Sequence, residues 1–178
     1  MPFTKPRIKQ PLGAAHRTTT IFAAILAALS LVACSANDTK GPVTTTDSNT
    51  VVVHKSPFCL CCKSWMAHLE DNGFSVISEN SLDTAEIKVS HDVPASLQGC
   101  HTGVVNGRYV FEGHVPARLI RRYLANPPPN SIGLAVPGMP QGSPGMYRGK
   151  DFAPYDVFLI RPGGDYELYE HISAPETT

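Results

Sequence analysis

The sequence predicts a domain of the α/β class, in which helices flank a mixed sheet. Two observations carry this prediction. Short β-branched or apolar runs alternate with segments in which apolar residues recur at helical spacing. In addition, a cluster of three cysteines, Cys59, Cys61 and Cys62, stands where the first such run passes into the first helical segment. The elements are taken below in chain order.

Residues 50–54 are β-branched and apolar, and they predict a short buried strand that ends at the turn Ser56-Pro57. A helix follows, because apolar residues recur at i, i+3, i+4 and i+7 and form one stripe. This stripe consists of Cys62, Trp65, Met66 and Leu69. The pair Asn72-Gly73 ends the helix.

The following segments predict a second strand over 74–78 and a second helix over 82–90, with Asp83 as its cap. The helix must end before Pro94. Two further strands, 102–106 and 108–112, are joined by a tight turn at Asn106-Gly107. A third helix then covers 115–124 and carries Pro116 in its first turn.

The order strand, helix, strand, helix, strand, strand, helix predicts a thioredoxin-like domain with the cysteines at the first strand-to-helix junction. After it come a Gly- and Pro-rich loop, Gly133 to Gly149, and a C-terminal hairpin made of Asp156 to Ile160 and Tyr166 to Tyr169. A loop this long in a compact domain is usually functional or disordered. We expect residues 50–173 to form one thioredoxin-like domain.

The first 33 residues are typical of an export signal. Four basic residues, Lys5, Arg7, Lys9 and Arg17, precede an uncharged apolar run from Ile21 to Val32. A membrane-spanning helix needs ~20 apolar residues, so this run is short for a span but suits the apolar region of a signal peptide. We expect residues 1–33 to be cleaved.

The end of this signal, Leu31-Val32-Ala33-Cys34, resembles the lipobox of bacterial lipoproteins, which makes Cys34 a lipidation site and the mature N-terminus. An ordinary secretory signal that contains a cysteine is the alternative. Residues 34–49 are polar and predict a flexible tether. Ser35 is not acidic, which favours the periplasmic face of the outer membrane of a Gram-negative bacterium.

Charge argues against nucleic acid as a partner. The chain has 15 basic and 15 acidic residues, but residues 1–33 hold four of the basic ones and none of the acidic ones. The mature chain therefore carries 11 basic and 15 acidic residues, whereas nucleic-acid binding calls for a basic surface. Contact with the membrane is expected through the lipid anchor only.

The three clustered cysteines lie at a predicted helix N-terminus, where unpaired N–H groups and the positive dipole end favour thiolate over thiol. Thiolate is the form that binds metal. A buried structural role is common for a single cysteine. A hydrophobic core, however, does not require small sulfur groups at adjacent positions, so a chemical role is favoured for the cluster.

Two chemistries remain open for these cysteines. Cys59 and Cys62 have the C-x-x-C spacing of thioredoxin-like redox proteins, and exported thiols tend to form disulfides. Against a redox role, Cys61 and Cys100 would offer routes to wrong pairing. Moreover, Cys100 stands where a redox thioredoxin normally has a cis-proline. A sulfur atom there would face the cluster and complete a cage of four thiolates.

The crowding of the cysteines favours copper(I) over zinc. Zinc prefers four well-separated tetrahedral ligands, and the neighbours Cys61 and Cys62 cannot easily reach opposite corners of one ion. Adjacent thiolates can instead bridge small soft ions, and copper(I) prefers thiolate, thioether and imidazole ligands. We therefore expect a copper(I) site that is multinuclear where thiolates bridge, with zinc as the weaker candidate.

Other side chains are candidates for the surroundings of this site. Met139 and Met146 both stand in Pro-Gly-Met units of the long loop, where a thioether either binds copper(I) or anchors the loop. His101 adjoins Cys100 and is a candidate ligand or support. His68 and His114 are weaker candidates, because a packed or solvated ring and a helix-cap position explain them. Trp65 is simplest as a core residue.

Three motifs occur in order: SPFCLCCKSWMAHLEDNGF, GCHTGVVNGRYVFEGHVPARLIRRYL and GLAVPGMPQGSPGMY. Together they resemble a periplasmic metal-binding family that includes the CopG-type copper-resistance proteins. The resemblance runs from Val51 to His171. It departs from the family at Leu60, where Gly is usual, and at Tyr147, where an acidic residue is common. It implies a thioredoxin-like fold, copper binding through the cysteines and a setting in copper tolerance.

Two classes of function follow. The first is a copper-binding protein that exchanges metal with other periplasmic copper-handling proteins, and the second is an oxidoreductase that acts on disulfides or on copper. The sequence does not decide whether a reaction is catalysed. No Ser-His-Asp set, phosphate-binding loop or carboxylate pair stands out, so hydrolase and transferase chemistry are disfavoured.

Overall fold

The computed structural model of the chain describes residues 48–175. The signal peptide predicted for 1–33, the lipidation site Cys34 and nearly all of the tether predicted for 34–49 lie outside the described residues and stay predictions. Within the part that is described, no helix is long and apolar enough to cross a membrane.

The elements follow the predicted order and extend it. The strands are β1 Thr50–Lys55, β2 Ser75–Asn80, β3 His101–Val105, β4 Tyr109–Gly113, β5 Gly133–Val136, β6 Tyr155–Ile160 and β7 Tyr166–Ile172. The helices are α1 Leu60–Asp71, α2 Ala85–Ser90 and α3 Ala117–Ala125, with short 3-10 turns η1 Ala95–Leu97 and η2 Pro162–Gly164. The predicted strands, helices and C-terminal hairpin are all present, with ends that differ by a few residues.

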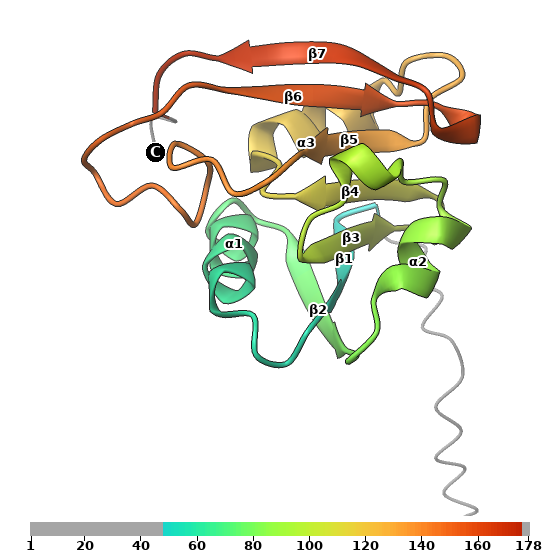
Figure 1. Cartoon of the computed structure of the whole chain (residues 1–178), viewed down its shortest axis with the longest axis horizontal. Helices are drawn as coiled ribbons and strands as arrows, with labels where there is room; N and C mark the ends of the chain where they lie inside the picture. The colour runs from blue at the N-terminus through green and yellow to red at the C-terminus, as the bar shows by residue number, and fades with distance from the viewer. Residues whose placement is uncertain (1–47, 176–178) are drawn as a thin grey trace, which may run out of the picture. The chain divides into compact units, whose positions relative to one another are not determined.

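The strands form one mixed sheet of seven in the order β2-β1-β3-β4-β5-β6-β7 (Figure 1). The pairs β1–β2 and β4–β5 are parallel, because a helix leads from one strand to the next, and the other neighbours are antiparallel. The fold is therefore a mixed α/β fold dominated by its sheet.

One prediction about the loops is wrong. The loop predicted for 133–149 begins only after Val136, because Gly133–Val136 forms strand β5 beside β4. Gly133 is required in this strand, since a Cβ atom would lie 1.7 Å from the carbonyl oxygen of Val110. β5 joins the predicted four strands to the C-terminal hairpin and so makes one continuous sheet.

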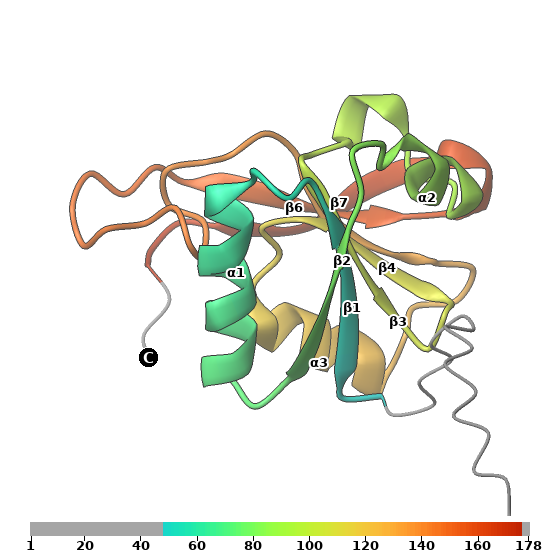
Figure 2. The ribbon, with the colours of Figure 1, turned by 90° about the horizontal axis from the view of Figure 1, so that it is seen from below.

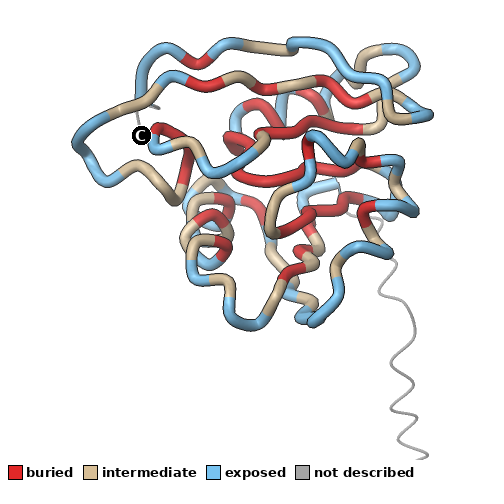
Figure 3. Tube along the Cα trace, viewed as in Figure 1, coloured by how far each residue is buried: buried red, intermediate tan, exposed pale blue. Residues whose placement is uncertain are grey.

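The helices are divided between the two faces of the sheet (Figure 2). α1 and α3 contribute to the larger core on one face, while η1 and the segment after α2 cover the other face with Val93 and Leu97. Side chains alternate between the faces, so Phe111 joins the larger core and its neighbour Val110 joins the smaller one. Burial is greatest in the central strands (Figure 3).

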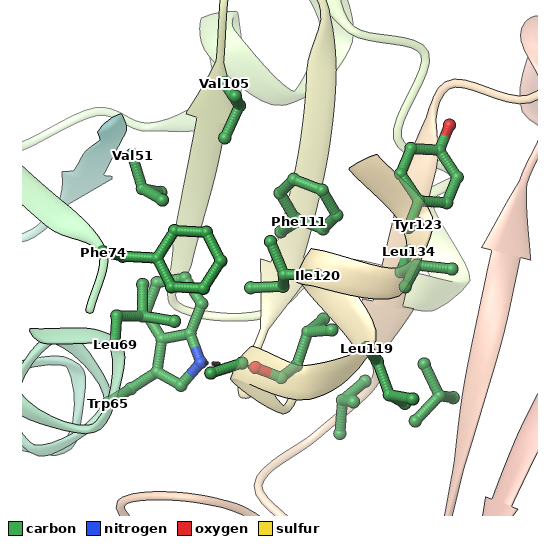
Figure 4. Close-up of a cluster of buried hydrophobic side chains, with 14 of the residues drawn as sticks. Val51, Trp65, Leu69, Phe74, Val105, Phe111, Leu119, Ile120, Tyr123 and Leu134 are labelled. Carbon is green, nitrogen blue, oxygen red and sulfur yellow. Dashed lines mark hydrogen bonds between the residues drawn. The ribbon is translucent and has the colours of Figure 1, made fainter. Parts of the chain in front are cut away.

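The larger core fixes the position of α1 on the sheet (Figure 4). Trp65 of α1 is fully buried and donates its indole N–H to the carbonyl of Val115 at 2.9 Å. Its ring lies over Gly103 of β3, where a Cβ atom would be 3.0 Å from the ring and 2.9 Å from Val51. Gly103 thus lets α1 approach the sheet closely at the end of the molecule that holds the cysteines.

The remaining loop, residues 137–154, is ordered by contacts with α1 and with itself. Ser143 is fully buried and donates its hydroxyl to the carbonyl of Pro140 at 2.7 Å. Gly145 has a φ of +82° and lies against the backbone of α1, where a Cβ atom would be 2.7 Å from the backbone nitrogen of Trp65. The loop therefore brings Met139 to Cys61 in the first turn of α1 and Pro144 to His114.

Candidate metal centre

The four predicted sulfur ligands meet at one point. Cys59 caps α1, Cys61 and Cys62 occupy its first turn, and Cys100 directly precedes β3. Because β1 and β3 are antiparallel neighbours, with Lys55 opposite His101, the chain leaving β1 passes the chain entering β3. The four Sγ atoms all lie within 4.8 Å of one another.

Cys61 is central among these sulfurs. Its Sγ lies 3.5 Å from the Sγ of Cys59 and 3.9 Å from the Sγ of Cys100. Cys59 and Cys62 are joined by a disulfide, whereas Cys61 and Cys100 are free thiols. The centre thus offers two free thiols in its oxidised form and four after reduction of the disulfide.

The N-terminus of α1 contacts the cluster through its cap. The backbone N–H of Cys62 donates to the Sγ of Cys59 at 3.3 Å, so a sulfur atom replaces the oxygen of an ordinary helix cap. Burial and the nearby Cys61 thiol raise the pKa of Cys100 above its usual value. Without a metal ion Cys100 is therefore a thiol at neutral pH, and a bound cation would displace its proton.

The two candidate methionines lie in different settings. The Sδ atom of Met139 is 3.8 Å from the Sγ of Cys61, and the Met139 side chain is 54 % exposed. Met146 is partly buried, and its backbone N–H donates to the carbonyl of Ser143. Among the described residues, no cysteine thiol is hydrogen-bonded to Met146, so only Met139 extends the sulfur cluster.

His101 and His114 lie behind the cysteines in the core. Both are fully buried, their ring centroids are 5.1 Å apart, and His101 also stacks on Trp65 at 4.5 Å. One ligand atom from each of Cys100, His101 and His114 lies within 4.8 Å of the other two. Burial lowers the pKa of His101 to about 3 and also lowers the pKa of His114, so both rings are neutral near pH 7.

His68 does not join this centre. Its Nε2 accepts the backbone N–H of Ala117 at 3.0 Å, so this ring satisfies an unpaired donor at the start of α3. Accordingly, burial lowers its pKa and keeps it a neutral acceptor. The interpretation of His68 and Trp65 as packed side chains agrees with these contacts, whereas the helix-cap explanation for His114 misses its place beside Cys100.

A buried ion pair holds the chain just before Cys100. Glu112 accepts the ammonium of Lys88 and the backbone N–H of Gly99 on the same carboxylate oxygen, each at 2.6 Å, and its other oxygen accepts the Thr102 hydroxyl at 2.6 Å. Sequence reasoning missed this network. One signal was present, because Glu112 shares a strand face with the apolar Val110 and an acidic residue on such a face needs a partner.

The chain is similar to a protein family and to solved structures. The family described as "Protein of unknown function, DUF411" matches residues 97–146, which include Cys100, His101, His114 and both candidate methionines. No curated protein matches the chain.

Two solved structures, copper resistance protein copG forms 1 and 2, are each 38 % identical to the chain. The chain aligns with form 2 at a TM-score of 0.64, with 70 % of this chain and 98 % of that one covered. For form 1 the TM-score is 0.65, with 73 % of this chain and 100 % of that one covered.

Proposed function

Since the chain belongs to the family of the copper resistance protein CopG, we propose that it binds copper(I) through its cysteine cluster and serves copper tolerance. The observation that carries this proposal is the meeting of four Sγ atoms within 4.8 Å. Soft thiolates select copper(I), zinc or iron–sulfur clusters, and softness alone does not separate these.

Two features of the centre favour copper(I) among these metals. Cys61 and Cys62 are adjacent, which suits bridging between several ions better than the corners of one tetrahedron. Met139 adds a thioether at 3.8 Å from Cys61, and thioethers are ligands of copper(I) and not of structural zinc. A cysteine-bridged, multinuclear copper(I) centre is the form that we propose.

Anaerobic titration with copper(I) tests this proposal. The reduced protein should retain copper(I) against a competing chelator, and a variant with Cys59, Cys61 and Cys62 all changed to Ser should not. Titration of the same samples with zinc provides the comparison for metal choice. Equal copper retention by the parent and the triple variant would contradict the proposal.

A second candidate function is a thiol–disulfide oxidoreductase, and the Cys59–Cys62 disulfide is the observation that favours it. In that reaction a substrate dithiol would reduce this disulfide, and two electrons and two protons would pass from substrate to protein. Rapid reduction and reoxidation of Cys59 and Cys62 without metal would support this function. Stoichiometric copper with four protected thiols would support the first.

We also propose that β1 to β4 with α1 and α3 constitute a thioredoxin-like core. The support is the element order β1–α1–β2–α2–β3–β4–α3, the parallel pair β1–β2 and the antiparallel β3 and β4. On this assignment β5, β6 and β7 are an addition to the edge of the core sheet. Superposition of residues 50–125 alone on thioredoxins tests the assignment.

The setting that we propose is the periplasm, with a lipid anchor at Cys34 in the outer membrane. The support is the basic and apolar segment 5–32 and the lipobox-like Leu31 to Cys34. Exchange of copper with other periplasmic copper-handling proteins belongs to the same proposal. Fractionation of cells that express Cys34→Ser should move the protein from the membrane to the soluble periplasm, and an unchanged membrane fraction would contradict the anchor.

A further inference from the structure

His101 and His114 present buried ring nitrogens that the protein does not satisfy. Both nitrogens of His101 and the Nε2 of His114 are inaccessible to solvent and have no hydrogen-bond partner among the described residues. Buried polar groups in proteins are nearly always paired. Three unpaired nitrogens on two touching rings therefore indicate a ligand for this part of the core.

A hydrogen bond to the backbone of Pro144 orients the ring of His114 and leaves the lone pair of its Nε2 free. Its Nδ1 lies 2.7 Å from the carbonyl oxygen of Pro144, and a carbonyl only accepts, so Nδ1 carries the proton. In the neutral ring, Nε2 then has its lone pair free. A histidine that binds metal through one nitrogen usually donates the other N–H to a carbonyl or carboxylate, and His114 has this arrangement.

His101 supplies the second nitrogen from the neighbouring strand. Its ring is fixed between Trp65 and His114, at 4.5 Å and 5.1 Å between centroids. The backbone of Gly113 lies near the ring and acts to raise the pKa of His101, against the larger effect of burial. The geometry is nevertheless too poor for a hydrogen bond to either ring nitrogen. His101 also follows Cys100 directly, so its ring and the Cys100 sulfur lie together at the start of β3.

The ligand chemistry follows from the donors. Two neutral imidazoles and one thiol meet within 4.8 Å, and carboxylates are absent from this donor group. A hard cation such as Mg²⁺ or Ca²⁺ would need oxygen ligands. Copper(I) and zinc both accept imidazole and thiolate together, and copper(I) is the metal proposed for the adjoining sulfur cluster. A copper(I) ion would bind the Cys100 thiolate and imidazole nitrogens, and the Cys100 proton would leave to solvent.

We propose that Cys100, His101 and His114 form a second, nitrogen-containing copper(I) position behind the sulfur cluster, with Cys100 shared between the two. This proposal deepens the proposed copper function and depends on it. It adds a kind of ligand that the four cysteines and Met139 do not provide. It also gives His114 a role as a ligand and Pro144 a role in orienting it.

X-ray absorption at the copper edge tests the proposal on the reduced, full-length protein loaded anaerobically with copper(I). Scattering from nitrogen and from the outer atoms of imidazole rings should accompany scattering from sulfur. Sulfur-only scattering in the parent would overturn the proposal, while cysteine-dependent copper binding would still stand. Absence of cysteine-dependent copper would instead reject the proposed function itself.

A variant assigns the imidazole signal to a residue. His114→Leu should hold at least one copper(I) ion fewer than the parent and should show less imidazole scattering. The matched control is His171→Gln, because His171 is exposed, bonds Asp156 and belongs to neither donor group; its copper count should match the parent. Unchanged scattering in a folded His114→Leu protein would overturn the assignment. If this variant does not fold, the parent spectrum decides alone.

Discussion

Glu112 fixes the backbone of Gly99 through a hydrogen bond of 2.6 Å from the Gly99 N–H to the buried carboxylate. The same carboxylate neutralises Lys88, which is only 4 % exposed, and it accepts the hydroxyl of Thr102. Since Cys100 follows Gly99, this buried charge pair helps to determine where a sulfur ligand lies just before β3.

Glu112→Gln should destabilise the protein strongly. The change keeps the size of the side chain but leaves the Lys88 ammonium buried without a counter-charge, which costs about 3–5 kcal/mol. Denaturant unfolding monitored by Trp65 fluorescence measures this. Glu167→Gln is the control, because Glu167 is 56 % exposed and its ion pair with Arg161 contributes about 0–1 kcal/mol. Similar losses in both variants would contradict the role of Glu112.

The apo protein should lose stability as the pH falls below about 6.5, which is the pKa of an unfolded histidine. Burial lowers the pKa of His101 to about 3 in the folded state, so the unfolded chain binds its proton first. Each pH unit between these values lowers the free energy of unfolding by about 1.4 kcal/mol for His101 alone. The lowered pKa values of His68 and His114 act in the same direction.

Unfolding curves of the metal-free, reduced protein at pH 7, 6, 5 and 4 measure this dependence. A folded His101→Leu variant should show a smaller dependence on pH than the parent. Identical pH profiles for the parent and His101→Leu would show that His101 is not responsible.

Met139→Leu should weaken copper(I) binding by a few-fold to tenfold, because the thioether of Met139 lies 3.8 Å from the Cys61 sulfur. Met146→Leu is a matched control in the second Pro-Gly-Met unit, and its affinity should equal that of the parent. Competition with a copper(I) chelator measures both variants. A larger loss for Met146→Leu would contradict the difference that the structure draws between the two residues.

Oxidation should reduce the copper capacity of the protein. With Cys59 and Cys62 joined, Cys61 and Cys100 are the free thiols of the described chain, so the oxidised form should bind fewer copper(I) ions than the reduced form. Anaerobic titration before and after thiol reduction measures the difference. A folded Cys59→Ser and Cys62→Ser double variant should show a smaller difference between the two conditions, and a difference as large as that of the parent would contradict this explanation.

Local patterns predicted most of the fold. The apolar stripe of α1 and the Asn106-Gly107 turn between β3 and β4 are properties of neighbouring residues, and they appear in the structure where the sequence placed them. β5 was missed because it has four residues inside a Gly- and Pro-rich segment, and its strand form depends on pairing with β4 and β6. Such pairing leaves little trace in a short sequence window.

Two parts of the centre could be predicted from the sequence. One is the group of cysteines that are close together in the chain, and the other is Cys100, whose place follows from the order of strands and helices. Cys100 was assigned because the expected order puts the start of the third strand opposite the first helix, and its sulfur lies 3.9 Å from that of Cys61. Met139 and Met146 share the tripeptide Pro-Gly-Met, so the folded loop was needed to distinguish them. His114 resembles a residue before a helix, and its burial beside His101 arises from tertiary packing.

The position of Cys100 in both donor groups makes the two groups thermodynamically linked. One thiol supplies one proton, so the first copper ion to bind Cys100 removes the proton that a second ion would otherwise have to displace. A bridging thiolate would also divide its electron density between two cations, and two cations that share a ligand repel each other. The coupling free energy is the same whichever donor group binds copper first. Its sign decides whether the protein binds copper ions one at a time or all together as a cluster.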